Sequence, residues 1–310
     1  MSALLQVRVI SPWFGESETE HAFFSVHLPP ERADALLCDW APSGELFAFP
    51  GTKAWYCCEP PAQFRSQAGG TWTAIRSRLA AGEFLFYNHP NPRFRVPHIT
   101  HYGKVERNWR SNRLNRAIAV VSNAGPAPWR RTAAMCLRVH FCTQPNVDLY
   151  GRHSGWVRCR KRFWSPPALP ANYVNELTGD WSQGAKGEML SRYKVAVCLE
   201  NSYEPNYFTE KFVDAVKAGC IPVYHAHETV RHTFLRDAKW VDPEQFEFDP
   251  EATIHYALEQ SAGPYWEANG KWIESEQFAT TSAEQVLGRI GTILVSQHGF
   301  QKGNNVPPRA

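Results

Sequence analysis

The chain has 310 residues, of which 43% are hydrophobic and 20% are charged, so its composition excludes an intrinsically disordered protein. This length is enough for two domains of ordinary size. The formal net charge of +3 gives no sign of the strong basic stripe of a nucleic-acid-binding protein, and we expect no nucleic-acid partner.

The first third of the chain alternates short apolar runs with polar or aromatic breaks, a pattern typical of a parallel α/β domain of Rossmann type. The runs that we interpret as strands are 7–10, 35–38, 53–58 and 84–87. Parallel strands end at a common edge of their sheet, so we expect the residues that follow these runs to gather there.

Glu59 follows the third run, after an aromatic stretch and before Pro60 and Pro61. A carboxylate held among aromatic side chains can have a raised pKa and act as a general base. A turn or helix-capping carboxylate is the alternative interpretation. Asn88 and His89 follow the fourth run and are candidate contacts for an acceptor substrate, with an ordinary surface or core role as the alternative for each.

We expect the second domain to begin with a clear apolar strand at 117–121, and we place the domain boundary just before it. The helix expected near Pro128 carries Arg130 and Arg131. A guanidinium at the rim of a sheet can bind diphosphate oxygens in a bidentate manner, and a solvated arginine pair is the alternative. We interpret the basic run 158–162 as a solvated loop, with contact to acidic membrane headgroups as the alternative.

The stretch from Tyr193 to Tyr224 has the pattern strand, loop, helix, strand. Its first strand is the run 195–199, and its helix has a cap at Asn206 or Thr209 and a stop at Gly219. In a right-handed unit of this kind, polar residues after the first strand and in the first helical turn share one end of the sheet.

Lys211 is the most informative residue of this stretch. A cation in the first turn of a helix is opposed by the positive end of the macrodipole, so it requires an anion, which a ligand phosphate would supply. Its neighbour Glu210 suits the paired hydroxyls of a ribose, as acidic residues do in dinucleotide sites. An ordinary Glu-Lys pair on a solvated face is the alternative.

The same stretch resembles the signature of the α1,3/4-fucosyltransferases, in the bacterial type of glycosyltransferase family 10. The residues that carry the resemblance are Tyr193-Lys194, Glu200-Asn201-Ser202, Tyr207, Thr209-Glu210-Lys211, Ala218-Gly219 and Ile221-Pro222-Val223. The resemblance implies an α/β fold of the GT-B class, in which two Rossmann-like domains face a cleft. It also implies a GDP-fucose donor and inverting transfer of L-fucose, expected at O3, to a GlcNAc-type residue of a glycan.

The resemblance further implies roles for individual residues. Glu59 matches the family's proposed catalytic base, and counting from the preceding strand favours Arg130 over Arg131 as a phosphate contact. The residues that would bind the donor are Arg130, Asn201, Tyr207, Glu210 and Lys211. The resemblance implies no required cofactor, with stimulation by Mn²⁺ or Mg²⁺ left open.

One segment departs from the family pattern. His225-Ala226-His227 stands where relatives usually have a glycine after the strand, which puts the backbone shape and the fit of the acceptor in doubt. A His-x-His pair can bind a metal, but the sequence shows no third ligand and no Asp-x-Asp motif, so we expect no metal site.

We expect four segments along the chain: an acceptor-binding domain at 1–116, a GDP-fucose-binding domain at 117–281, a helix at 282–302 and a disordered tail at 303–310. An apolar stripe at helical spacing indicates that last helix, which in GT-B proteins crosses back onto the first domain. The stripe consists of Val286, Leu287, Ile290, Ile293 and Leu294. A final strand is expected at 240–241.

The start of the chain is interpreted as a strand rather than a signal or anchor, and no apolar run approaches the ~20 residues of a membrane span. The eight cysteines are scattered and form no C-x-x-C pair, as expected of reduced thiols. We therefore expect a cytoplasmic enzyme, at most peripheral at the inner membrane, whose glycan acceptor can be lipid-linked or lipopolysaccharide. The alternatives are a GT-B transferase of another sugar nucleotide and a non-catalytic nucleotide-sugar binding protein.

Overall fold

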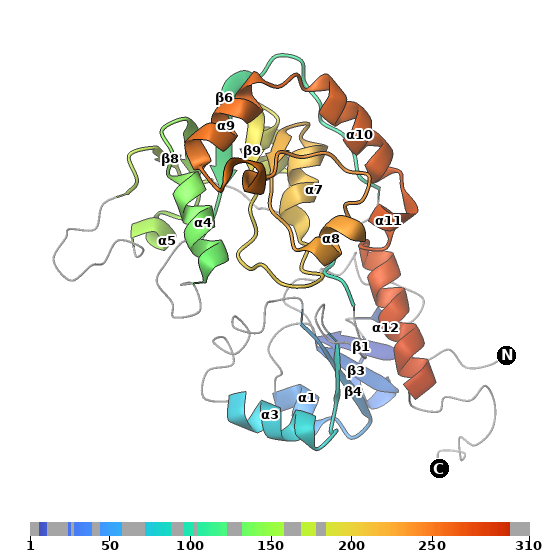
Figure 1. The fold of residues 1–310 in the computed structure, drawn as a ribbon. Coiled ribbons are helices and arrows are strands. Elements are labelled where there is room, and N and C mark those ends of the chain that lie inside the picture. The colour runs from blue at the N-terminus through green and yellow to red at the C-terminus, as the bar shows by residue number, and fades with distance from the viewer. Residues whose placement is uncertain are drawn as a thin grey trace, which may run out of the picture. The chain divides into compact units, whose positions relative to one another are not determined.

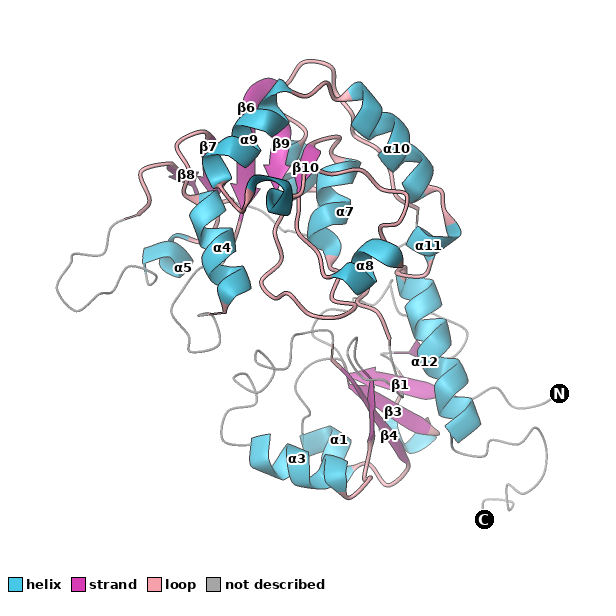
Figure 2. Ribbon diagram, in the orientation of Figure 1, coloured by secondary structure: helices cyan, strands magenta, loops and turns pink. Residues whose placement is uncertain are grey.

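The computed structural model describes residues 6–10, 24–25, 28–38, 44–57, 72–87, 96–101, 104–122, 132–157, 169–177 and 184–297. The chain divides into two compact units, Met1–Tyr102 together with Thr281–Ala310, and Gly103–Thr280 (Figure 1). Each unit has a parallel sheet with helices against it (Figure 2). None of the described helices combines the length and the hydrophobicity that a membrane span requires.

The sheet of the first unit has the order β2-β1-β3-β4-β5, and its neighbouring strands are parallel. Its strands are β1 (Val7–Ile10), β2 (Phe24–Ser25), β3 (Ala35–Cys38), β4 (Thr52–Tyr56) and β5 (Leu85–Tyr87). Its helices are α1 (Gly44–Ala48), α3 (Trp72–Ala80) and α12 (Ala283–Gln297), with a 3₁₀ turn at Pro30–Arg32.

Alternate residues of β3 explain why both faces of this sheet are covered. Ala35 and Leu37 face a core that includes Val286 and Ile290 of α12, whereas Leu36 and Cys38 face the core of α1 and α3. The apolar stripe of α12 therefore packs on the sheet of the unit that contains the N-terminal strands. The backbone N–H of Thr100 donates to the carbonyl of Thr281, which ties the start of α12 to the same unit.

The sheet of the second unit has the order β10-β9-β6-β7-β8, again with parallel neighbours. Its strands are β6 (Leu114–Val120), β7 (Val147–Tyr150), β8 (Tyr173–Asn175), β9 (Tyr193–Val197) and β10 (Ile221–Val223). Its helices are α4 (Ala133–Cys142), α5 (His153–Val157), α6 (Ala185–Leu190), α7 (Glu210–Lys217), α8 (Glu228–His232), α9 (Pro250–Glu259), α10 (Gly263–Ile273) and α11 (Glu276–Ala279), with a 3₁₀ turn at Pro243–Phe246.

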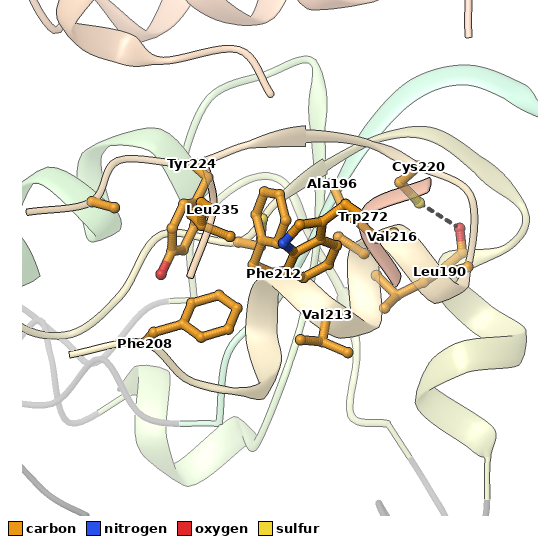
Figure 3. Close-up of a cluster of buried hydrophobic side chains, with 14 of the residues drawn as sticks. Leu190, Ala196, Phe208, Phe212, Val213, Val216, Cys220, Tyr224, Leu235 and Trp272 are labelled. Atoms are coloured by element: carbon orange, nitrogen blue, oxygen red, sulfur yellow. Dashed lines mark hydrogen bonds between the residues drawn. The ribbon is translucent and has the colours of Figure 1, made fainter. Parts of the chain in front are cut away.

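An aromatic cluster fixes α7 on this sheet (Figure 3). Phe212 of α7 lies edge-on to Trp272 of α10, with ring centroids 5.3 Å apart, and 5.0 Å from the ring of Tyr224. Ala196 of β9 belongs to the same core. Because Phe212 directly follows Lys211, this packing also sets the position of the first turn of α7.

The second unit begins earlier than the boundary expected at 116/117. The segment 104–113 packs along this unit, where the Trp109 indole N–H donates to the carbonyl of Val216 at 2.9 Å and stacks on Trp266. Arg113 donates to the carbonyl of Tyr193 at 2.8 Å. Gly219 follows the end of α7 in a left-handed conformation with φ of 75°. No larger residue fits there, because a Cβ would lie 2.6 Å from both Trp109 and Arg113.

The α/β class and the two Rossmann-like units expected from the sequence are confirmed, whereas the cleft implied by the GT-B class stays a prediction. Residues 240–241 are not a strand as expected. Val241 makes only an isolated bridge to Val223, since the chain turns at Asp242 into a 3₁₀ turn.

Candidate functional site

The strand order of the second unit points to one end of its sheet. The chain runs from β6 through β7 to β8 on one side, and returns to β9 and β10 on the other side of β6. Open parallel sheets bind ligands outside the carboxyl ends of their strands, at the point where the order reverses. Here that point lies between β6 and β9.

A pocket of about 310 Å³ lies at this point. One wall is the first part of α4, with Ala133, Ala134 and Leu137, and the opposite wall contains Glu200, shortly after β9. Thr132 links the two walls, because its hydroxyl caps α4 by accepting from the N–H of Met135 and lies 3.5 Å from the carbonyl of Asn201. The remaining lining includes three ring-bearing side chains, Tyr203, His225 and Phe248.

Glu200 is the centre of a buried hydrogen-bond network. Its side chain is 3% exposed and accepts from the Thr209 N–H at 3.0 Å and from the Thr209 hydroxyl at 2.7 Å and 2.8 Å. The Tyr224 hydroxyl donates to it at 3.0 Å. Burial and the nearby carboxylate raise the pKa of Tyr224, which therefore remains a hydrogen-bond donor. These contacts lock the end of β9 to the start of α7.

Lys211 completes this network. Its Nζ lies 3.1 Å from Glu200 Oε2, donates to the Thr209 hydroxyl at 2.8 Å and lies 3.6 Å from Glu210 Oε1. Burial alone would lower the pKa of Lys211, but the charges of Glu200 and Glu210 outweigh it and raise that pKa. The lysine is therefore a fixed cation in the first turn of α7.

Glu200 supplies the anion that Lys211 requires. The sequence predicts that a ligand phosphate supplies this anion, but in the structure a carboxylate of the chain itself does so. The sequence analysis assigned no role to Glu200, although it stands within the matched signature. Glu210 differs from it, because its side chain is 42% exposed and its carboxylate remains accessible beside Lys211.

The other two described residues expected in the donor site lie next to each other. The Tyr207 hydroxyl donates to Asn201 Oδ1 at 2.7 Å. Thr209 is at the N-cap position of α7, as one of the two expected caps, but its side chain makes no capping hydrogen bond. Its hydroxyl donates to Glu200, and Asn206 takes a left-handed conformation with φ of 60° in the loop before α7. The loop thus brings Asn201, Tyr207, Glu210 and Lys211 to one end of the sheet.

The sequence analysis missed an aromatic wall of the pocket. The Tyr203 ring stacks on His225, with centroids 4.8 Å apart and an interplanar angle of 7°, and Phe248 meets His225 edge-on at 5.0 Å. Tyr203 is 47% exposed and Phe248 38% exposed, so these surfaces are open to a ligand. His225 was singled out as a departure from the family pattern, but nothing in the sequence signals Phe248, which has a left-handed φ of 61°.

His225 is held by a polar network rather than by His227. Its Nδ1 lies 2.9 Å from Asp242 Oδ1 and donates to it, since a carboxylate only accepts. Arg231 lies 2.9 Å from Asp242 and 2.6 Å from Glu244. Burial alone would raise the pKa of Asp242, but hydrogen bonds from His225 and the Glu244 N–H and the charges of His225 and Arg231 outweigh it and lower that pKa.

The same network bears on metal binding. His225, Asp242 and Glu244 place potential ligand atoms within 4.8 Å of one another, so the structure brings together the partners that the sequence did not show. Arg231 already neutralises both carboxylates, which disfavours a metal ion there. His227 instead caps α8 by accepting from the N–H of Thr229.

Several expected site residues lie outside the described residues. They are Glu59, Asn88, His89 and Arg130, together with Arg131 and the basic run 158–162. Their expected roles stay predictions.

Comparison with known proteins identifies the family. Residues 110–285 match the model of the C-terminal part of glycosyltransferase family 10 (fucosyltransferase), which is more than half of the chain. The chain belongs to glycosyltransferase family 10. The matched range contains the Glu200 network and the pocket, and the resemblance noted in the sequence is thereby confirmed.

Individual family 10 relatives and solved structures are distant. α-(1,3)-Fucosyltransferase B of Drosophila melanogaster is 27% identical over 110 residues, which are 36% of this chain and 22% of that protein. A crystal structure of an α1,3-fucosyltransferase aligns with 98% of this chain and 94% of its own, at 15% identity and a TM-score of 0.46. An α,α-trehalose-phosphate synthase from Burkholderia xenovorans aligns with 84% of this chain and 73% of its own, at 10% identity and a TM-score of 0.49.

Proposed function

We propose that this protein transfers L-fucose from GDP-fucose to a hydroxyl, O3, of a GlcNAc-type residue in a glycan, with inversion at the anomeric carbon. Membership of the fucosyltransferase family supports the class of reaction. The observation that carries the donor site is the fixed cation Lys211, which lies at the carboxyl end of the sheet, joined to a wall of the 310 Å³ pocket through Glu200.

The donor would use the described residues in three ways. Lys211 would meet the diphosphate, and the accessible carboxylate of Glu210 would accept from the ribose hydroxyls. The stacked rings of Tyr203 and His225 would offer a flat surface to the nucleobase. The Asn201–Tyr207 hydrogen bond would hold the loop between these contacts in shape.

Fixed cations near the diphosphate would also contribute to the rate. Negative charge grows on the departing GDP as the glycosidic bond breaks, so a preorganised lysine stabilises the transition state more than the ground state. In this proposal Glu59 removes the proton from the attacking acceptor hydroxyl, Arg130 adds a phosphate contact, and Asn88 and His89 contact the acceptor. These four roles rest on the sequence.

We further propose a cytoplasmic enzyme that requires no metal and acts on a lipid-linked or lipopolysaccharide-type glycan. These proposals also rest on the sequence. Activity that persists in EDTA would support metal independence, whereas stimulation by Mn²⁺ or Mg²⁺ would show only that a metal assists diphosphate departure.

The test is GDP release by the purified chain from GDP-fucose, with EDTA present and a panel of β-galactosyl-GlcNAc and GlcNAc acceptors. We expect release that depends on the acceptor, with the product linkage read by NMR. Release from another sugar nucleotide at a higher rate would reassign the donor. Saturable binding of GDP-fucose without release on any glycan acceptor would support a non-catalytic binding protein instead.

A further inference from the structure

A second, smaller cavity lies beside the pocket in the same unit. It has a volume of about 20 Å³, which is room for about one water-sized oxygen. Three basic side chains from three helices line it: Arg138 of α4, Lys186 of α6 and Lys211 of α7. The rest of its lining is apolar except for the thiol of Cys198, at the end of β9.

Two of these three cations have anionic partners in the chain. Lys211 pairs with Glu200, and Lys186 Nζ lies 2.6 Å from Asp214 Oδ2. Cys198 supplies no negative charge, because burial raises the pKa of its thiol well above the ordinary value. The cavity therefore contains no uncommitted anion among the described residues that line it.

Arg138 is the exception among the three. It is 8% exposed, and within the part of the chain that the structure describes, no hydrogen bond or ion pair joins its guanidinium to another residue. Its positive charge also opposes that of Lys211. A cation that is largely removed from water and has no anion beside it is unfavourable, so a residue of this kind is expected where a ligand supplies the missing charge.

The positions of the neighbouring residues connect this cavity with the larger pocket. Ala134 and Leu137 of α4 line the pocket, whereas Arg138, which directly follows Leu137, lines the cavity. Likewise Glu200 lines the pocket and its ion-pair partner Lys211 lines the cavity. The two cavities therefore have neighbouring lining residues on α4 and are linked by the Glu200–Lys211 ion pair.

We propose that Arg138 is a further donor-binding residue, whose guanidinium together with Lys211 binds an oxygen of the terminal phosphate of a nucleoside diphosphate. This rests on the proposed function, in which the unit binds GDP-fucose. The size of the cavity suits one phosphate oxygen, and the planar fork of an arginine can reach such an oxygen with two N–H groups. Arg138 was not among the residues that the sequence indicated for the donor.

The test is calorimetric binding of GDP, GMP and pyrophosphate to the wild type, Arg138→Met and Arg138→Lys. We expect the wild type to prefer GDP to GMP, and Arg138→Met to weaken GDP and pyrophosphate about tenfold or more while GMP changes less than twofold. Arg138→Lys keeps the charge without the fork and should fall between the two. Arg192→Met is the matched control, because it removes one positive charge from a side chain that is 55% exposed.

Thermal unfolding of the ligand-free proteins separates binding from a structural role. Arg138→Met should be at least as stable as the wild type, because it removes a charge that has no partner among the described residues. A clearly less stable variant, or one whose GDP affinity matches the wild type, would overturn the assignment. A wild type that binds pyrophosphate through Arg138 but neither GDP nor GDP-fucose would contradict the proposed function and leave the phosphate site standing.

Discussion

Arg113 and Arg138 are both in the second unit, but their guanidinium groups have opposite surroundings. Arg113 lies near the amino end of β9, where it donates to the carbonyls of Arg110, Tyr193 and Ala218. Arg138 lies near the carboxyl end of β9, where none of the described groups accepts from it. Arg113 therefore stabilises the fold, whereas Arg138 has the surroundings that we propose for a ligand-binding residue.

Lys211 lies between these two cases, because it has a partner in the chain and yet faces the cavity. We expect Lys211→Ala to lower turnover ~10²-fold or more, by analogy with the loss of an oxyanion donor. GDP release at saturating donor and acceptor measures this. Lys217→Ala, in the last turn of the same helix, is the matched control and should retain the wild-type rate.

A wild-type rate in Lys211→Ala would remove this lysine from the donor site. Unfolding measurements belong with the experiment, because the substitution also leaves the Glu200 carboxylate without its cation. A variant that is fully folded at the assay temperature and nevertheless slow would place the effect in catalysis rather than in stability.

Arg113→Met should act on stability alone. It leaves three carbonyl acceptors without their donor, so we expect the free energy of unfolding to fall by about 2 kcal/mol. Urea unfolding measures this, with the exposed Arg192→Met as the control. Affinity for GDP should stay within twofold of the wild type. An unchanged unfolding midpoint would mean that Arg113 does not have the structural role that distinguishes it from Arg138.

Arg231 differs from Arg138 because it forms ion pairs with two carboxylates, Asp242 and Glu244. Its partner Asp242 gives a test with a smaller expected effect. The pKa of Asp242 is lowered by folding, so this carboxylate stabilises the protein above its unfolded pKa of about 3.9, and the contribution is lost as the pH falls through the lower folded value. We expect Asp242→Asn to lower the free energy of unfolding at pH 7 by about 1 kcal/mol.

The pH dependence of that difference is the measurement. The difference in unfolding free energy between Asp242→Asn and the wild type should shrink below about pH 4. It should vanish below the folded pKa, where Asp242 of the wild type is protonated in both the folded and the unfolded state. Asp237→Asn, at a side chain that is 63% exposed, should show little difference at any pH. A difference for Asp242→Asn that persists unchanged at low pH would show that charge at Asp242 does not stabilise the network.

Much of the fold could be predicted because strand signals are local. The strands expected at 7–10 and 35–38 have the same bounds in the structure. The start of the second unit at Gly103 could not be read in this way, because the segment before β6 belongs there through contacts such as Trp109 with Trp266. Those contacts join residues far apart in the chain.

Some residues of the candidate site could be predicted from the sequence and others could not. One strand-loop-helix stretch contains four of them, so sequence reasoning could find them together: Asn201, Tyr207, Glu210 and Lys211. Glu200 belongs to that stretch too, but its burial depends on Tyr224 and Thr209 closing around it. Arg138 carries no motif, since only tertiary structure places it beside Lys211.

The return of α12 to the first unit has a consequence for folding. In the first sheet, the apolar face with Leu37 is covered by Val286 and Ile290, which follow about 250 residues later in the chain. The second unit lies wholly between them and can complete its own sheet earlier, as it leaves the ribosome. Closing so long a loop is slow, so the first sheet should be the last part of the chain to gain its full core and, until then, the part most exposed to aggregation.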